Sequence, residues 1–271
     1  MKENRENIVS SSPKFTMKPY LICPTCGSDD IMKNGTTRRG KQNYKCRDCG
    51  RQFVENPQWQ PKDKDTCAMI DRLLLERIPL AGIARVLNLS ESWLQQYVNE
   101  CYEQTSKQAQ VVPKTTSQLT VEMDELWSFV DDKGNKQWVW LAIDRQTREI
   151  IGCYVGDRSE ASARALWQSL PSRYRQYARI YTDHWEAYAC VLPSKRHFAV
   201  DKDSGMTSHI ERLNNTLRQR ISRLVRRSLS FSKKLENHIG AIWNFIHYYN
   251  QKIRAKMQRE QQSAFISLSF T

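Results

Sequence analysis

The sequence predicts a multidomain chain in which two small N-terminal segments precede a larger mixed α/β domain. Three observations lead to this fold class. Two C-x-x-C pairs occur near the N-terminus, apolar residues recur at helical spacing over residues 64–104, and strand and helix patterns alternate from residue 119 onwards. At 271 residues and 39% hydrophobic content, the chain is long enough for two or three domains with cores of their own.

The charge of the chain bounds its partners. A formal net charge of +13 favours a polyanion, either nucleic acid or an anionic membrane surface. The membrane alternative is weak because no apolar run approaches a spanning length. The N-terminal stretch MKENRENIVSSSPKF has no hydrophobic region typical of a secretory signal. We therefore expect a cytoplasmic protein whose partner is nucleic acid.

The first structured segment is expected over 19–56, after a flexible leader at 1–18. The chain has eight cysteines, and four of them form the pattern C-x2-C-x19-C-x2-C in this segment. A glycine directly follows each C-x2-C pair. This spacing is typical of a four-thiolate zinc site, and the alternatives, redox pairs or disulfides, are disfavoured in an intracellular chain. The expected Zn²⁺ ligands are Cys23, Cys26, Cys46 and Cys49.

The stretch between the cysteine pairs, IMKNGTTRRGKQNYKC, reads as a hairpin with a basic tip. Arg38, Arg39 and Lys41 are expected to face nucleic acid, together with Lys33 and Lys45. The alternative is that these side chains are simply solvated.

A helix-turn-helix domain is expected over 62–104, after a linker marked by Pro57 and Pro61. A short amphipathic helix over 80–87, a turn at 88–89 and a longer helix from 91 give the pattern. In this interpretation Ser90 caps the second helix, whose Ser92, Gln95 and Gln96 lie near base edges in the major groove. An ordinary helical bundle has the same periodicity. Residues 105–117 read as a linker.

The third domain is expected over 118–257. Strands are predicted at 119–130, 136–143, 149–156, 179–183 and 197–200, with helices at 159–170 and 185–192. Three antiparallel strands followed by strand–helix alternation indicate a mixed five-stranded sheet with helices on its faces.

Three carboxylates from separated parts of this domain can form one site. Asp124 lies in the first strand, Asp183 at the end of the fourth, and Glu211 on a later helix. Such a set can hold two Mg²⁺ or Mn²⁺ ions about 3.5–4 Å apart for phosphoryl transfer. Asp124 competes with Glu122, Glu125 and Asp144 for this role. Asp183 could instead cap the next helix, and Ser208-x-x-Glu211 matches a capping box.

The helix predicted over 208–225 has three stripes. An apolar stripe, Ile210 to Leu224, faces the core, and a polar stripe carries Glu211, Asn214 and Arg218. The opposite face is basic, and its residues are Arg212, Arg220, Arg223, Arg226 and Arg227. The alternative is a solvated helix face, but five arginines without acids among them would repel one another unless anions are present, so this face is expected to lie along DNA phosphates. A final helix is predicted over 231–257, and 258–271 are expected to form a C-terminal tail.

Four blocks of the sequence resemble the insertion-sequence-one family of prokaryotic transposases. They are CPTCGS…YKCRDCGRQF, VEMDELWSFV…KQWVWLAIDR, YTDHWEAY and SHIERLNNTLRQRISRLVRRS. The resemblance covers about residues 20–250. It implies a ribonuclease-H-like catalytic domain and a DDE transposase with Asp124, Asp183 and Glu211 as the acidic triad.

The resemblance also implies the partners. The zinc ribbon and the helix-turn-helix would bind the terminal inverted repeats of the element, and the active site would cleave those ends and join them to target DNA. Because two ends must be brought together, a homodimer or higher oligomer is expected. His184 and His209 flank the triad acids and could touch the scissile phosphate or be structural.

Two other function classes remain in view. One is a catalytically silent DNA-binding regulator derived from a transposase, against which the intact triad argues. The other is a nuclease acting on RNA–DNA hybrids, which are recognised by shape rather than by the major-groove readout of a helix-turn-helix.

Overall fold

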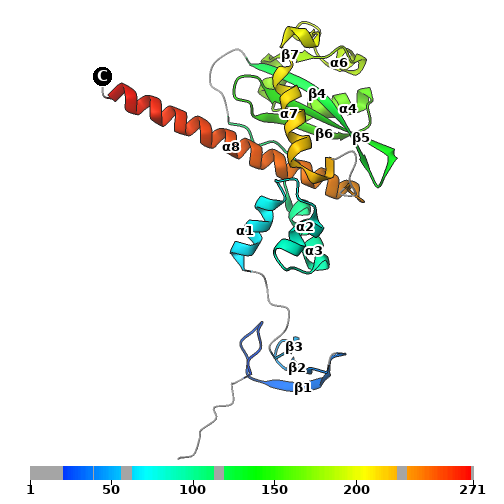
Figure 1. Cartoon of the computed structure of the whole chain (residues 1–271), viewed down its shortest axis with the longest axis vertical. Coiled ribbons are helices and arrows are strands. Elements are labelled where there is room, and N and C mark those ends of the chain that lie inside the picture. The colour runs from blue at the N-terminus through cyan, green and yellow to red at the C-terminus, as the bar shows by residue number, and fades with distance from the viewer. Residues whose placement is uncertain (1–20, 39, 56–62, 113–118, 225–230, 270–271) are drawn as a thin grey trace, which may run out of the picture. The chain divides into compact units, whose positions relative to one another are not determined.

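The computed structural model describes residues 21–38, 40–55, 63–112, 119–224 and 231–269. The expected leader, Arg39, the prolines of the first linker, most of the second half of the 105–117 linker, and Arg226 and Arg227 lie outside these residues. The chain divides into two compact units, Met1–Asp63 and Lys64–Thr271 (Figure 1).

The first unit is a small antiparallel sheet of three strands. Strands β1 (Ile31–Thr36), β2 (Gln42–Cys46) and β3 (Gln52–Val54) pair in the order β1-β2-β3. The β1–β2 pair is the predicted hairpin. Tyr44 and Phe53 pack across β2 and β3 with ring centroids 6.0 Å apart. Among the described residues of this unit only Cys23 and Cys46 are buried, so a unit of this size needs further stabilisation, typically from a metal.

The second unit begins with three helices close to the predicted ranges. They are α1 (Lys64–Leu73), α2 (Leu80–Val86) and α3 (Glu91–Gln104). Ser90 caps α3 as predicted, because its side chain accepts a hydrogen bond from the backbone N–H of Trp93. Asn88, in the turn before it, has a positive φ of 50°, a conformation that asparagine tolerates better than most residues.

A mixed sheet of five strands follows, as predicted. The strands are β4 (Thr120–Val130), β5 (Asp132–Asp144), β6 (Ile150–Gly156), β7 (Arg179–Thr182) and β8 (His197–Ala199). Their order is β6-β5-β4-β7-β8. The first three strands in sequence are antiparallel, and β7 and β8 run parallel to β4.

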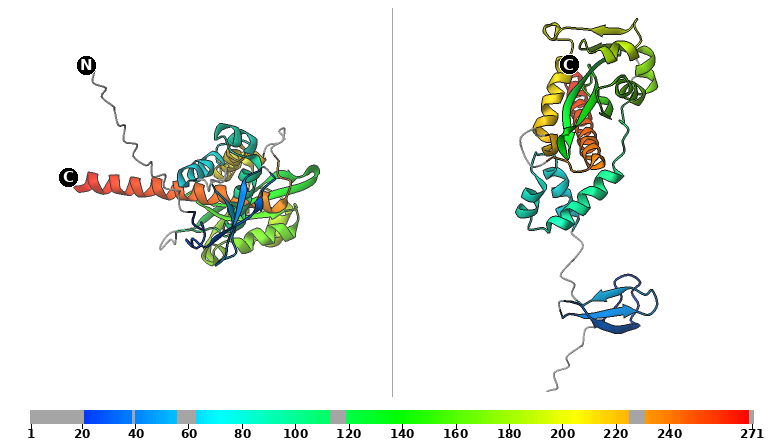
Figure 2. Two further views of the ribbon diagram at one scale, coloured as in Figure 1. Left: turned by 90° about the horizontal axis from the view of Figure 1, so that it is seen from below. Right: turned by 90° about the vertical axis from the view of Figure 1, so that its right-hand side faces the viewer.

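Helices cover both faces of this sheet (Figures 1 and 2). Helices α4 (Glu160–Ser169), α5 (Ser172–Tyr177) and α6 (Glu186–Val191) pack on the face that carries Val121 and Met123. On the other face, Leu126 shares a core with α7 (Ser208–Arg220), with α8 (Leu235–Ser269) and with α1 to α3. The period-two alternation predicted for β4 therefore sets which residues meet which helices.

The last helix differs from the prediction at both ends. α8 runs for 35 residues, from Leu235 to Ser269, instead of from 231 to 257. The expected tail at 258–271 is therefore wrong for all residues through Ser269. The sequence holds no glycine or proline after Gly240 to end a helix. Among the described residues, no helix is both long enough and apolar enough to cross a membrane.

Candidate functional site

The four predicted cysteines come together in the first unit. Their sulfurs all lie within 4.8 Å of one another, with Cys23 Sγ 3.5 Å from Cys49 Sγ and Cys26 Sγ 3.6 Å from Cys46 Sγ. A tetrahedral Zn²⁺ with bonds of about 2.3 Å holds its sulfurs about 3.8 Å apart, so the cluster fits zinc. All four cysteines are free thiols, and the disulfide alternative is not realised.

The two cysteine pairs sit in matching backbone turns. The N–H of Gly27 donates to Cys23 O at 2.9 Å, and the N–H of Gly50 donates to Cys46 O at 3.1 Å. Both glycines have φ of +73°, which a residue with a Cβ rarely adopts. The glycine after each C-x-x-C is thus what lets two similar turns present their sulfurs to one point.

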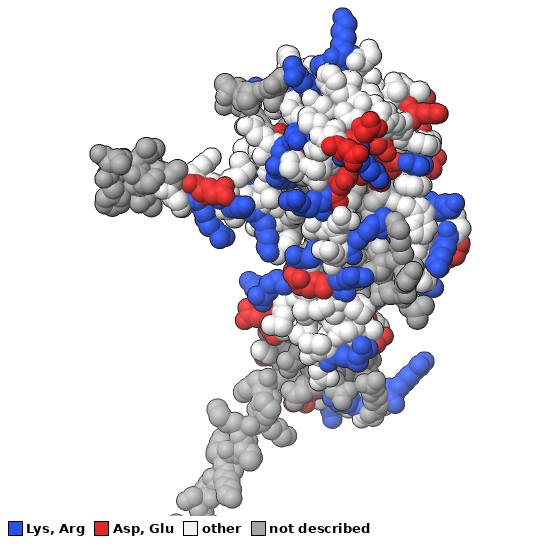
Figure 3. Space-filling model, turned by 45° about the horizontal axis from the view of Figure 1, so that its top comes forward, with Lys and Arg blue, Asp and Glu red and all other residues white. Residues whose placement is uncertain are grey.

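An acidic pocket of about 380 Å³ lies at one end of the sheet in the second unit. Asp124, Asp183 and Glu211 all line it, together with Glu125. Carboxylate oxygens of Asp124, Glu125 and Asp183 lie within 4.8 Å of one another. On the face drawn in Figure 3, Asp and Glu side chains gather in one patch with Lys and Arg side chains around it.

The sheet topology explains why Asp124 and Asp183 meet. The parallel pairing of β4 with β7 ends at Glu122 and Tyr181, and β7 itself ends at Thr182. Asp183 therefore follows the carboxyl end of β7 directly beside the continuing β4. Ligands of open α/β sheets characteristically bind at this end of the strands.

Helix α7 brings the remaining groups. Asn214 Nδ2 donates a 2.8 Å hydrogen bond to Asp124 Oδ2, and Glu211 lies one turn earlier on the same helix. Glu211 Oε1 accepts from Thr207 Oγ1 at 3.1 Å, and Glu211 is not in the tightest acidic group. The polar stripe predicted for this helix does face the sheet, since Arg218 also donates to the carbonyl of Trp127.

Burial and charge raise the pKa of Asp124 to about 7. Removal from water is the largest cause, and the negative charge of Glu125 adds to it, with smaller contributions from Asp183 and Glu211. The backbone N–H of Glu125, which donates to Asp124 Oδ1, acts in the opposite direction. Hard divalent cations would remove this repulsion, so the donor set fits Mg²⁺ or Mn²⁺. The side-chain oxygen of Asn214, Oδ1, is also buried and has no hydrogen-bond partner among the described residues.

Glu125, which the sequence offers only as a competitor of Asp124, is a fourth acid of the pocket. It is buried, pairs with Arg158 at 2.7 Å, and accepts a 2.9 Å hydrogen bond from the Tyr188 hydroxyl. Arg158 and Tyr188 could not be predicted as its partners, because both are distant in sequence from Glu125 and neither belongs to a recognisable motif.

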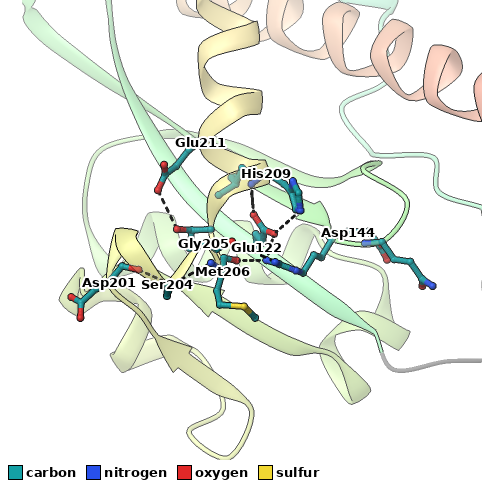
Figure 4. A network of polar contacts seen from close by, with 12 residues as sticks. Glu122, Asp144, Asp201, Ser204, Gly205, Met206, His209 and Glu211 are labelled. Atoms are coloured by element: carbon teal, nitrogen blue, oxygen red, sulfur yellow. Dashed lines mark hydrogen bonds and ion pairs between the residues drawn. The ribbon is translucent and has the colours of Figure 1, made fainter.

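The other two competing acids, Glu122 and Asp144, are paired or hydrogen-bonded to groups outside the pocket. Glu122 pairs with Arg145 at 2.6 Å and accepts hydrogen bonds from the backbone N–H groups of His209 and Ile210 (Figure 4). Asp144 pairs in register with Val121, toward the start of β4 and away from the pocket. It accepts from two backbone N–H groups of its own turn and from the Tyr174 hydroxyl.

The helix-capping alternatives for the triad are wrong. α7 begins after Thr207 with no side-chain cap, and its first N–H groups are satisfied by Glu122 from β4. Glu211 therefore does not close a capping box with Ser208. Asp183 Oδ1 accepts from the N–H of Trp185, which itself precedes α6, so Asp183 holds the turn before that helix and does not cap it.

The predicted five-arginine face does not form on one helix. α7 ends at Arg220, and Ser222–Leu224 is a short 3₁₀ turn, so Arg223 leaves the helical face. Arg220 donates to Leu75 O and pairs with Glu76 at 2.7 Å, while Arg223 lies over the ring of Tyr102. Arg212 alone of the described members keeps an exposed position on α7.

Most of the other predicted contact residues that the structure describes are exposed. Arg38 lies at the β1–β2 tip beside the half-buried Lys41, and Ser92, Gln95 and Gln96 lie on the outer face of α3. His184 pairs with Asp201 at 3.1 Å, and His209 Nε2 lies 4.0 Å from Glu122. Neither histidine lines the acidic pocket.

Two families match this chain. Residues 118–252 match the IS1 transposase family, and residues 21–50 match the InsA N-terminal domain, a zinc ribbon. The insertion element iso-IS1n protein InsB of Shigella dysenteriae is 34% identical to this chain over 128 residues. The aligned region covers 47% of this chain and 94% of that protein. The chain is 38% identical over 133 residues to the IS1 protein InsB of Shigella flexneri, covering 48% of this chain and 98% of that protein. The IS1 2 protein InsB of Escherichia coli K12 is 35% identical over 143 residues, or 52% of this chain and 83% of that protein. The chain belongs to the IS1 family of transposases.

Proposed function

We propose that this transposase binds the terminal inverted repeats of its own element and catalyses metal-dependent cleavage and strand transfer as a DDE enzyme. The observation that carries the proposal is the pocket in which Asp124, Asp183 and Glu211 meet, although 87 residues separate the first acid from the last. The strand order β6-β5-β4-β7-β8 supports a ribonuclease-H-like fold for the domain.

The three acids would hold two Mg²⁺ or Mn²⁺ ions. When bound, such a pair supplies stabilisation of the attacking and leaving oxygens of a phosphoryl transfer. Asn214 orients Asp124 by its 2.8 Å hydrogen bond, and Thr207 orients Glu211 in the same way. Attack of water at the end of the element would break the P–O bond to the 3′-oxygen and free a 3′-hydroxyl there. That hydroxyl would attack a phosphorus of the target DNA, form a new phosphodiester bond and displace the 3′-oxygen of the adjacent target nucleotide.

The N-terminal modules would select the DNA. We propose that the zinc ribbon over 19–56, with Arg38, Arg39 and Lys41, contacts the duplex backbone. We further propose that α2 and α3 act as a helix-turn-helix within 62–104, with Ser92, Gln95 and Gln96 toward base edges. The linker at 105–117 leads to the catalytic domain at 118–257. The exposure of Arg38, Ser92, Gln95 and Gln96 supports the proposal, as does the exposed position of Arg212 on α7.

Two further features follow from the reaction. Because two element ends must be joined in one event, we propose that the protein works as a homodimer or higher oligomer. It would act in the cytoplasm, where the chromosome of a prokaryote lies.

The test uses a labelled duplex that carries the element's own end. We expect nicking and strand joining in Mg²⁺ or Mn²⁺, and none with Asp183→Asn, which keeps the shape of the side chain but loses its charge. Asp203→Asn, at an exposed acid outside the pocket, is the matched control and should retain activity. Tight end binding without metal-dependent chemistry in the wild type would instead indicate the catalytically silent regulator.

A further inference from the structure

Arg158 forms part of the wall of the acidic pocket, at the junction between β6 and α4. The backbone on both sides of it is fixed. The Asp157 carbonyl accepts a 2.8 Å hydrogen bond from Trp140 Nε1, and the Asp157 carboxylate accepts from the hydroxyls of Ser159 and Ser162. The side chain of Arg158 therefore starts from a rigid turn.

The guanidinium group itself is held on several sides. Its Cζ lies 3.9 Å from the ring centroid of Trp185 and 4.6 Å from that of Trp138. Its Nε and Nη2 donate to Glu125 Oε1 at 2.9 and 2.7 Å. A guanidinium that is stacked on aromatic rings and paired along one edge has lost most of its freedom before any ligand arrives.

The remaining edge of the guanidinium is open. The Arg158 side chain is 35% exposed, whereas that of Glu125 is 1% exposed. Within the described chain, Nη1 makes no hydrogen bond. Arg158 thus presents unpaired donors to a pocket, and it does so next to a carboxylate whose oxygens lie within 4.8 Å of oxygens of Asp124 and Asp183.

The charge of the pocket indicates what these donors can bind. Four carboxylates line it against two cations, Arg158 and Lys202. Once divalent cations compensate the acids, the open edge of the guanidinium favours an oxyanion, and its planar array of donors matches a phosphate. Resting on the proposed function, which makes DNA the ligand, we propose that Arg158 binds a backbone phosphate within one nucleotide of the scissile bond.

In this arrangement Glu125 and the two tryptophans orient Arg158, and Arg158 fixes the register of the DNA strand over the metal ligands. The role differs from that of a surface arginine, because the contact involves one phosphate and not the duplex in general.

The experiment replaces backbone phosphates one at a time by neutral methylphosphonates across the element end. Binding is measured by fluorescence anisotropy in Ca²⁺, and the initial rate of nicking is measured in Mn²⁺. Wild-type protein should lose about ten- to a hundredfold at one position beside the scissile bond, the range for a charge-assisted hydrogen bond. Arg158→Lys should show a similar loss on unmodified DNA and no further loss at that position.

Lysine is the chosen variant because it keeps a positive charge beside the buried Glu125 but lacks the second planar edge of donors that the guanidinium presents to a phosphate. Its thermal midpoint should stay close to that of the wild type. Arg164→Ala is the control, since Arg164 lies on α4, outside the pocket, and among the described residues it pairs with the exposed Glu160. It should keep the wild-type pattern at every position.

The outcomes separate this inference from the proposed function. If Arg158→Lys loses activity equally at all positions, or keeps the wild-type pattern, Arg158 has only a structural role and the inference fails. If the wild type never nicks DNA but Arg158 still accounts for one phosphate in the binding series, the inference stands and the catalytic proposal fails.

Discussion

The carboxylate of Glu122 lies 2.6 Å from the guanidinium of Arg145 beneath the first turn of α7 (Figure 4). Arg145 also donates to the carbonyl of Met206, and Glu122 accepts from the N–H groups of His209 and Ile210. The pair thus anchors the N-terminus of the helix that carries Glu211. Since Asp124 follows two residues later on the same face of β4, this strand holds both a candidate metal ligand and the anchor of another.

Removing this anchor should destabilise the second unit. We expect Glu122→Ala to lower the free energy of unfolding by about 3–5 kcal/mol, because it leaves buried donors without an acceptor. Glu122→Gln should cost less. Denaturation in urea measures both, and Glu160→Gln, at an exposed ion pair, should change the midpoint little. A Glu122→Ala protein as stable as Glu160→Gln would contradict the anchoring role.

Metal binding at the acidic pocket should depend on pH. With the Asp124 pKa raised to about 7 by burial and by the charge of Glu125, protons compete with metal below that pH. In the metal-free protein, deprotonation of Asp124 costs stability as the pH rises from about 4 through 7. Mn²⁺ should therefore raise the thermal midpoint more at pH 8 than at pH 6. Asp124→Asn should remove most of this difference, and a metal effect independent of pH would argue against the site.

His238 predicts a separate loss of stability in acid. It is fully buried in α8, and burial, with a smaller effect of Arg223, lowers its pKa to about 4. An imidazole with a folded pKa below its unfolded pKa of about 6.5 contributes stability above that pH, and this is lost as the pH falls toward 4. The loss should be about 3 kcal/mol. His238→Gln should flatten this part of the stability curve, whereas His184→Gln, at a largely exposed side chain, should leave it unchanged.

Zinc should be required by the first unit and not by the second. We expect one Zn²⁺ per chain by atomic absorption, with Cys26→Ser or Cys49→Ser removing it. Chelation should make the ribbon sensitive to proteases while the unit from Lys64 onwards stays resistant, because the two units are separately compact. Cys190→Ser alters an exposed thiol outside the cluster and should leave the zinc content unchanged.

Gly240 should not tolerate alanine. In an open helix this change usually stabilises by about 1 kcal/mol. Here an added Cβ would lie 2.9 Å from Cγ and 3.1 Å from Cα of Tyr102, where α3 packs against α8. Because the backbone of α3 at Tyr102 would have to move to relieve this clash, we expect Gly240→Ala to lower the thermal midpoint of the protein. An equal or higher midpoint would show that α3 can move away from α8.

The strands and the zinc ligands were predictable because their signals are local. Alternation in β4, the spacing of the cysteines and the polar stripe of α7 each follow from geometry within one element. The prediction of one basic face on this helix was wrong because the end of the helix depends on contacts with distant residues. The helical wheel assumed a regular helix through 225, but the chain leaves α-helical geometry after Arg220, where tertiary contacts with Leu75 and Glu76 hold the arginine.

The roles of residues that act through partners distant in the chain could not be predicted from the sequence. Glu122 could be recognised as an acid in an apolar strand, but its bonds to the start of α7 depend on a helix 87 residues away. Arg158 gave no periodic signal, because its role comes from Glu125 and from two tryptophans on other elements.

The pocket joins β4, the end of β7 and α7 through carboxylates that repel one another. Ions held by Asp124, Asp183 and Glu211 would act as a removable cross-link between these three segments, in addition to the β4–β7 pairing and the hydrogen bonds from α7 to β4. Such a cross-link restricts the open states of the domain much as a disulfide does, but it can form and dissociate without any covalent chemistry. Amide hydrogens of α7 should then exchange more slowly when metal is present. The domain would be most rigid at the moment when its active site is loaded.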